Sequence, residues 1–412
     1  MAESLMNPRV RLFMALVFIG LSLFAKSSHA ESTLSCNNGT SLTHVYPSGA
    51  QWAVCAALDD NVGLHLSELH YQAPGAEPRR TFSELHLGGL LEHYHNESQE
   101  RSVLSELNFG GDAFVSFKAH NCPGELVALK DGSNNLCAVG YADRILAKFG
   151  STSVLQSHRW DVIAAASDGQ DVWEVSISFG EEGSITPTVK RSGVIHRFTH
   201  NLNFGSTGFE NSGDGGAYAV NSTLLATWRI VPGFALEFDE NDAGDGLRVE
   251  QYDFPLRTDL GNRRPMSVQT LTTETLRQLD RETFRTWVIT GPSGAGYSID
   301  VQNNGFQYRS KRYNWSLFDL ALTRFKACEK VTLDNPLGNT DSACGTSLEA
   351  FINGESLQNS IPVIWFSQSI PIVPSAEDRP LMQTRTVSFD LVPFDWTDVS
   401  PFAPAPMKGD GS

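Results

Sequence analysis

The stretch SLEAFINGESLQNSIPVIWFSQSIPIVPSAEDRPLMQTRTVSFDLVP, residues 347–393, decides the fold. Its centre, residues 361–366, is a short run of apolar β-branched and aromatic side chains, which is typical of a strand buried on both faces. Residues 375–380 form a turn with three charges, and residues 384–391 alternate polar and apolar side chains as a half-buried strand does. The stretch therefore predicts a strand, a charged turn and a second strand.

Most of the remaining chain has the same texture of short apolar or alternating runs bounded by Gly, Pro, Asn or Asp. Helix-like periodicity is confined to residues 272–280 and 141–147. We therefore predict a mainly β protein, a large antiparallel β-sandwich with few short helices. Its predicted strands are residues 51–58, 62–71, 84–95, 113–117, 125–129, 172–179, 184–189, 193–198, 224–230, 285–289 and 320–325.

The first 30 residues have the features of a cleavable signal peptide. Arg9 and Arg11 precede an apolar run over residues 12–25, and Ala30 ends a small-residue cleavage site. A run of this length is short for a retained membrane anchor, which is the alternative, and no second run long enough to span follows. We expect a secreted or periplasmic protein with no membrane span after cleavage. A loose lead-in over 31–50 precedes one domain over 51–401, and the Pro/Gly-rich tail 402–412 is expected to be disordered.

The net charge argues against one class of partner, and the cysteine count indicates disulfides. The formal net charge is −16, and removal of the signal peptide changes it to about −18, which disfavours nucleic acid. Six cysteines in an exported chain favour disulfides over metal sites. They allow 15 pairings, of which we favour the near-neighbour set, Cys36/Cys55, Cys122/Cys137 and Cys328/Cys344.

The 347–393 stretch resembles the end of the catalytic domain of quinone-dependent copper amine oxidases. The matching residues are Asn353, Glu355, Ser356, Val363, Trp365, Pro374, Glu377, Asp378, Pro380 and Met382. The resemblance extends from about residue 51 to residue 401 and implies that family's β-supersandwich and its homodimer. It also implies a reaction: a copper ion and topaquinone, a quinone made from a tyrosine, convert a primary amine to an aldehyde, ammonia and hydrogen peroxide.

The residues that this reaction needs are replaced at three separate places. Counting back from Phe179 puts Asp171 at the quinone tyrosine and Trp173 at the second tyrosine of the motif. A shift in alignment does not restore the phenol, because the sequence contains no tyrosine between Tyr141 and Tyr218. The general base falls at Asn108, whose amide does not abstract a proton at neutral pH; the neighbouring Asp112 reads as a loop acid.

The copper ligands are incomplete as well. Of the family's H-x-H pair only His200 is kept, with Phe198 at the other position, and the third histidine falls at Ile372. No histidine follows His200 in the sequence. His196 lies four residues before it, about 13 Å away on an extended strand, which is too far to complete the site unless the chain bends.

Three functions remain open from the sequence. The first is a non-catalytic family member that binds an unknown ligand or partner, with no cofactor. The second is an active primary-amine oxidase with copper and topaquinone, as the family resemblance by itself implies. The third is a secreted metal-binding protein that uses His93 and His95, the one H-x-H left in the chain. The resemblance places that pair in a loop.

Overall fold

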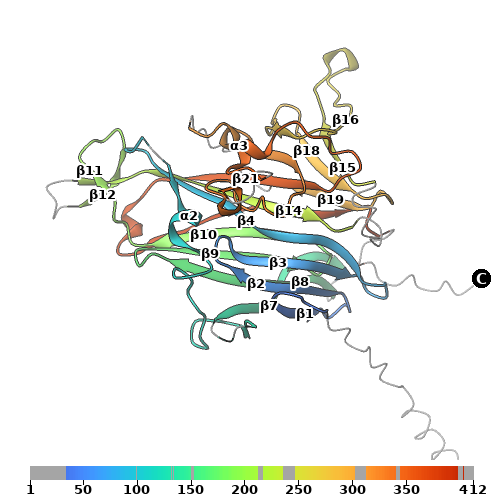
Figure 1. Cartoon of the computed structure of the whole chain (residues 1–412), viewed down its shortest axis with the longest axis horizontal. Helices are drawn as coiled ribbons and strands as arrows, with labels where there is room; N and C mark the ends of the chain where they lie inside the picture. The colour runs from blue at the N-terminus through green and yellow to red at the C-terminus, as the bar shows by residue number, and fades with distance from the viewer. Residues whose placement is uncertain are drawn as a thin grey trace, which may run out of the picture. The chain divides into compact units, whose positions relative to one another are not determined.

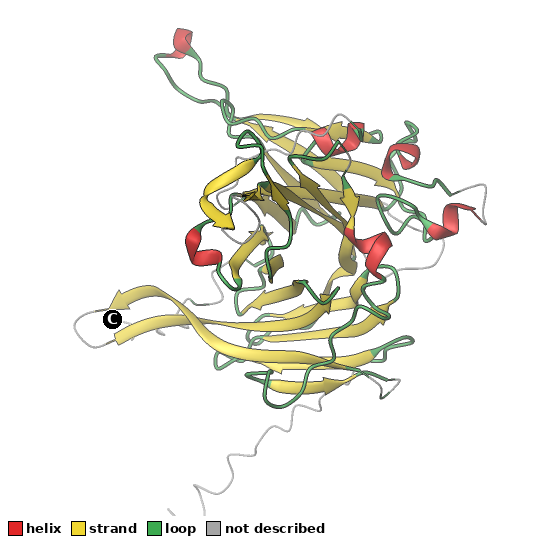
Figure 2. Cartoon of the chain, turned by 90° about the vertical axis from the view of Figure 1, so that its left-hand side faces the viewer, coloured by secondary structure: helices red, strands yellow, loops and turns green. Residues whose placement is uncertain are grey.

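Two large antiparallel sheets face each other and make up most of the structure (Figures 1 and 2). The computed structural model describes residues 34–98, 100–130, 132, 134–149, 153–211, 217–234, 246–301, 312–339, 344–397 and 402. The predicted signal peptide and nearly all of the predicted tail lie outside these residues. The mainly β sandwich that the sequence predicts is confirmed.

The first sheet has nine strands in the order β1-β2-β3-β4-β14-β21-β20-β17, with β5 paired to β4. Their bounds are β1 (Thr40–Val45), β2 (Gln51–Asp59), β3 (Gly63–Gln72), β4 (Arg79–Tyr94), β5 (Arg101–Ser102), β14 (Ser222–Pro232), β17 (Thr275–Arg277), β20 (Leu320–Arg324) and β21 (Pro362–Ile372). The lead-in is therefore not wholly loose, because β1 pairs with β2 along its whole length.

The second sheet has eleven strands in the order β16-β15-β18-β19-β23-β10-β9-β8-β7-β6, with β22 paired to β10. Their bounds are β6 (Glu125–Ala128), β7 (Asn135–Phe149), β8 (Ser153–Ser167), β9 (Asp171–Gly180), β10 (Ile185–Gly193), β15 (Arg248–Asp253), β16 (Ser267–Thr270), β18 (Thr286–Thr290), β19 (Gly296–Asp300), β22 (Met382–Ser388) and β23 (Asp390–Phe394). A third, small sheet holds β11 (Phe198–Thr199), β12 (Gly205–Asn211) and β13 (Ala217–Val220).

Helices are short and few in the described part of the chain. The α-helices are α2 (Val103–Leu107) and α3 (Leu348–Phe351), and the 3-10 turns are η2 (Thr258–Leu260), η3 (Asn314–Leu317), η4 (Pro336–Asn339) and η5 (Ala376–Asp378). Both predicted helices are wrong. Residues 141–147 belong to the long strand β7, and residues 272–280 contain β17.

A buried glutamate explains why residues 272–280 are not helical. Glu274 accepts backbone N–H bonds from Arg324 (2.9 Å), Asn353 (2.8 Å), Gly354 (3.1 Å) and Glu355 (3.2 Å). These bonds hold the segment in an extended conformation, and β17 pairs with β20 directly after it. Tertiary contacts therefore override the local periodicity.

The 347–393 stretch has the predicted order of strand, charged turn and strand. Strand β21 is buried on both faces over most of its length and lies between β14 and β20 in the nine-stranded sheet. In the turn, Asp378 accepts N–H bonds from Ser375 (2.9 Å) and Gln383 (2.7 Å) and pairs with Arg385. The second strand is divided into β22 and β23, which pair with β10. Two other predicted strands, 113–117 and 193–198, are mostly loops.

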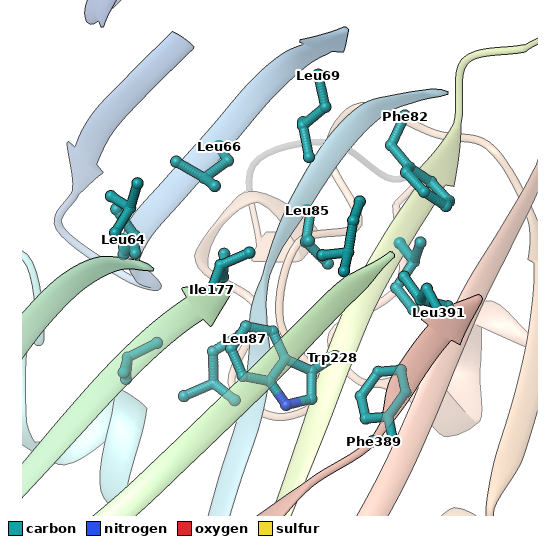
Figure 3. Packing of buried hydrophobic residues seen from close by; sticks show 14 of the residues in the cluster. Leu64, Leu66, Leu69, Phe82, Leu85, Leu87, Ile177, Trp228, Phe389 and Leu391 are labelled. Atoms are coloured by element: carbon teal, nitrogen blue, oxygen red, sulfur yellow. The ribbon is translucent and has the colours of Figure 1, made fainter. Parts of the chain in front are cut away.

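The main hydrophobic core lies between the two sheets (Figure 3). Alternate residues of β3 and β4, among them Leu64, Leu66, Leu85 and Leu87, point into it from the first sheet. Ile177 of β9 meets them from the second sheet. Because side chains alternate across a strand, the intervening residues of β3 and β4 point to the opposite face of the nine-stranded sheet.

All three favoured disulfides are present. They join Cys36 to Cys55, Cys122 to Cys137 and Cys328 to Cys344. Each closes a short loop and so restricts the unfolded chain. In the described residues, no helix is both long and apolar enough to cross a membrane.

The Cys328–Cys344 loop contains a buried acid, Glu329, whose pKa is raised. Glu329 is 2% exposed, and burial raises its pKa to about 7 although Lys326 Nζ lies 3.4 Å away. In the unfolded chain, glutamate ionises near pH 4.5. Between these values unfolding releases a proton, so this group lowers stability as the pH rises from about 4.5 to about 7.

We expect Glu329→Gln to remove that part of the pH dependence. At pH 5, where Glu329 is protonated, the variant and the wild type should have similar free energies of unfolding. At pH 8 the variant should be the more stable, because it carries no buried charge. Denaturant unfolding at both pH values measures the difference. If the free energies of unfolding of the variant and the wild type differ by the same amount at pH 5 and at pH 8, Glu329 does not have the raised pKa that we describe.

Candidate functional site

Three neighbouring strands of the nine-stranded sheet place one row of side chains at the end of the core. Ser222, the first residue of β14, is directly opposite Tyr94 on β4 and Ile372 on β21. All three are buried, with Tyr94 at 4% exposed and the other two at 1%. The row therefore forms one wall of a small cavity between the sheets.

The facing sheet supplies a buried ion pair. Asp171 begins β9, and its Cα is directly opposite Gly193 at the end of β10, two residues after Arg191. The Arg191 guanidinium donates to Asp171 Oδ1 (3.1 Å) and to the Tyr94 hydroxyl (3.1 Å). Arg191 also donates to Ser222 Oγ at 3.4 Å and so connects the two sheets.

A second carboxylate shares the same guanidinium. Glu92 Oε1, two residues before Tyr94 on β4, lies 2.8 Å from Arg191 Nη2. Burial raises the pKa of both Glu92 and Asp171, and Arg191 opposes this rise in each case. One buried cation thus faces two buried acids that repel each other.

The segment after β10 closes the site. The N–H of Val194 donates to the Gln170 carbonyl (2.9 Å), which holds the segment against β9. His196 Nε2 lies 4.0 Å from Asp171 Oδ2, and the guanidinium of Arg197 lies 5.1 Å from the centre of the Tyr94 ring. We call Glu92, Tyr94, Asp171, Arg191 and His196 the buried charge cluster.

The cavity beside the buried charge cluster is small. Its volume is about 20 Å³, which is room for a single water molecule. Its lining is Tyr94, Asp171, Arg191, Val194, Ile195, His196, Arg197, Val220, Ser222, Ile372, Pro374 and Met382. An open groove of about 570 Å³ lies next to it and shares His196 and Arg197 with it.

Of Asn108, Asp171, His200 and Ile372, four of the positions that the resemblance singles out, the structure brings two together. Asp171 and Ile372 line the same cavity. His200 is exposed in the turn after β11, and Asn108 is exposed at the C-cap of α2 in a left-handed conformation (φ 51°). Neither lines this cavity. His196 lines the cavity. Residues 194–197 are not a strand, so the spacing of about 13 Å between His196 and His200 that is expected on an extended strand does not apply.

Among the described residues, the His93/His95 pair has no third metal-ligating side chain close enough to complete a site. His93 lies in β4 and not in the expected loop, and its ring centre is 5.8 Å from that of His95. Each ring has another contact: His93 Nε2 with the Glu97 carbonyl (3.1 Å) and His95 Nε2 with Thr223 Oγ1 (2.9 Å). The Glu97 carboxylate pairs with Arg197.

Sequence reasoning missed Glu92, Tyr94 and Arg191, and gave His196 no role at Asp171. A signal for two of them was present. Glu92 follows residues 85–91, which are apolar except for His86, and Arg191 lies on a strand that alternates into the core. Charged residues are rarely buried unless they are paired. Two such charges of opposite sign therefore indicated an ion pair, although not its partners.

Comparison with known families decides the relationship. The model of the copper amine oxidase enzyme domain matches residues 175–409, which is more than half of the chain. The chain belongs to the copper amine oxidase family. The matched region begins four residues after Asp171 and includes His200 and Ile372. It therefore covers the three positions at which the resemblance places the copper ligands, Phe198 included, but not the position of the quinone tyrosine.

Solved copper amine oxidases have the same fold. An amine oxidase from Aspergillus nidulans superposes with a TM-score of 0.67 at 18% identity, over 86% of this chain and 52% of that one. A copper-containing benzylamine oxidase from Hansenula polymorpha gives 0.68 at 16% identity, over 92% and 65%. Lysyl oxidase from Pichia pastoris gives 0.67 at 17%, over 85% and 52%. This chain thus spans about half to two thirds of their length.

Proposed function

We propose that this chain is an exported copper amine oxidase homologue that does not oxidise amines and acts by binding a ligand or a partner. One observation carries the proposal. At the position where the resemblance places the quinone tyrosine, Asp171 is ion-paired with Arg191 beside a cavity of about 20 Å³. That volume holds a water molecule but is too small for the R group of a substrate amine R-CH2-NH2.

The residues of the cavity do not fit a copper–topaquinone centre. Copper in this family is held by three imidazoles, whereas His196 is the one histidine among the described residues that line this cavity. The nearby polar groups are two carboxylates and a guanidinium, and a guanidinium has no lone pair to give to a metal. Tyr94 is the phenol of the lining, and its hydroxyl accepts the Arg191 hydrogen bond.

The open groove next to the cavity is the proposed place for a ligand. Its volume of about 570 Å³ lies in the range of small-molecule sites. Its polar lining is Glu97, Glu100, Arg101, Glu106, Asp168, Gln170, His196 and Arg197. Four acids against two arginines give the lining a formal charge of −2. A small cation is therefore the ligand class that the groove favours.

We expect the purified protein to be colourless in the visible range and to release no hydrogen peroxide with benzylamine, even after incubation with copper. The reason is that residue 171 is an aspartate and not a tyrosine, that the Tyr94 phenol is hydrogen-bonded to Arg191, and that the described lining of the cavity has one imidazole. Absorption spectra and a coupled peroxide assay measure this. The Hansenula polymorpha benzylamine oxidase, assayed in parallel, is the positive control.

The alternative is a primary-amine oxidase, which the family match favours. In that reaction R-CH2-NH2, O2 and water give an aldehyde, ammonia and hydrogen peroxide, so the same assay separates the two functions. A visible band that a carbonyl reagent abolishes, together with amine-dependent peroxide, contradicts our proposal and establishes the alternative.

Export and dimerisation are parts of the same proposal. Three disulfides favour an oxidising compartment, secreted or periplasmic. The homodimer that the resemblance implies stays a prediction. It is supported by the segment between β15 and β16, which projects from the sheets and carries η2 (Figures 1 and 2). Leu256, Leu260 and Met266 are about half exposed or more on this segment.

A further inference from the structure

A pair of histidines and a glutamate meet on the face of β3 and β4 that points away from the main core. His65 on β3 is directly opposite His86 on β4, and Glu84 precedes His86 by two residues. The alternation that points Leu85 and Leu87 into the core (Figure 3) places Glu84 and His86 on the other face. Potential ligand atoms of the three side chains lie within 4.8 Å of one another.

We propose that His65, Glu84 and His86 bind one divalent transition-metal ion. Two ligands that are each about 2.1 Å from a metal lie at most about 4.2 Å apart. Small side-chain rotations therefore bring atoms that lie within 4.8 Å of one another to ligand distances. Two imidazoles and one carboxylate favour Zn²⁺ or Cu²⁺ over Ca²⁺ and Mg²⁺, which prefer oxygen ligands.

His86 is held in a form that binds metal. His86 Nδ1 lies 3.2 Å from the Leu87 carbonyl, which only accepts, so Nδ1 carries the proton and Nε2 has the free lone pair. A neutral imidazole with one unprotonated ring nitrogen is the ligand form, so His86 can present Nε2 to an ion without changing its tautomer.

The charged groups around the site orient the Glu84 carboxylate and leave the site accessible to a metal ion from solvent. The Arg229 guanidinium, on β14 opposite His86, donates to Glu84 Oε2, and Lys330 Nζ pairs with Asp59 at 2.9 Å. Ligating carboxylates commonly have such an outer partner, and Glu84 Oε1 is the oxygen available to a metal. The Glu84 side chain is 31% exposed, so an ion can enter from solvent and keep water at its open positions.

This site is distinct from the buried charge cluster. His86 and Tyr94 are eight residues apart on β4, roughly 26 Å along the strand. Among the described residues, it is also the one group of three such side chains with ligand atoms this close. The His93/His95 pair is therefore a matched control: it is a second close pair of histidines at the end of the same strand.

The test is titration of the full, metal-stripped protein with ZnCl2 by calorimetry and by competition with a chromophoric chelator. We expect one Zn²⁺ per chain, and no binding of Ca²⁺ at the same concentration. His65→Ala and His86→Gln should each weaken the affinity at least tenfold. The double variant His93→Ala with His95→Ala should retain both stoichiometry and affinity.

Several outcomes overturn the proposal. They are no zinc in the wild type, wild-type affinity in a folded His65→Ala protein, or loss of zinc in the His93/His95 variant. Should the buried His86→Gln variant fail to fold, the half-buried His65→Ala variant decides alone, with circular dichroism as the folding control. X-ray absorption of the zinc-loaded wild type should show two imidazoles, and a shell without imidazole also overturns the proposal.

Discussion

Replacing Arg191 by methionine is expected to lower the free energy of unfolding by about 3–5 kcal/mol at pH 7. Methionine fills much of the volume of arginine but leaves Glu92 and Asp171 buried without their cation. Uncompensated buried carboxylates are costly, and burial already raises the pKa of both groups. Denaturant unfolding at equilibrium measures the loss.

The pH dependence distinguishes lost charge from lost packing. In the Arg191→Met protein the carboxylates should ionise at higher pH than in the wild type, because the cation that lowers their pKa is gone. Folded carboxyls with raised pKa values bind protons that the unfolded chain has released, so stability falls as the pH rises. The destabilisation should therefore be larger at pH 8 than at pH 5.

Two further variants complete the experiment. Lys190→Met is the matched control on the same strand: its ion pair with Glu174 is about one-third exposed, and its removal should cost less than about 1 kcal/mol. The triple variant Glu92→Gln, Asp171→Asn and Arg191→Met removes all three charges and should recover part of the loss. An Arg191→Met protein no less stable than Lys190→Met shows that the cluster does not act as argued.

Replacing Trp365 by alanine is expected to cost a similar amount, about 3–5 kcal/mol. Trp365 lies in β21 and is fully buried on the outer face of the nine-stranded sheet. Its indole N–H donates to Thr323 Oγ1 (3.0 Å), and its ring centre lies 5.7 Å from that of Phe351. Alanine loses the ring contacts and leaves the Thr323 hydroxyl without this donor.

Two further variants serve as comparisons for the loss of stability in Trp365→Ala. Trp365→Phe keeps an aromatic ring and loses the indole hydrogen bond, so it should cost less than alanine. Val373→Ala changes a side chain that is 57% exposed just beyond β21 and should stay within about 0.5 kcal/mol of the wild type. A Trp365→Ala protein that is destabilised by under about 1.5 kcal/mol refutes the central packing role of this residue.

The alternation of polar and apolar residues predicted strands well where one face of the strand is buried. Strands β3 and β9 follow the predicted ranges because alternate side chains enter the core. The pattern was misleading at residues 141–147, in the outer half of β7. Residues 141–146 are exposed there, so no buried face imposes alternation, and pairing with β8 alone makes the segment a strand. At residues 272–280, the contacts of Glu274 decide the conformation.

The residue sequence alone showed that no tyrosine lies between Tyr141 and Tyr218, and it predicted most of the strands. The presence or absence of a phenol in a stretch of sequence can be read without coordinates. Only the tertiary structure revealed the surroundings of Asp171. Arg191 reaches Asp171 through the register of β9 and β10, and Glu92 through the packing of one sheet on the other. His65 and His86 likewise meet through strand pairing. The free-energy cost of burying a charged side chain depends on partners that are distant in the chain, so the local sequence does not specify that cost.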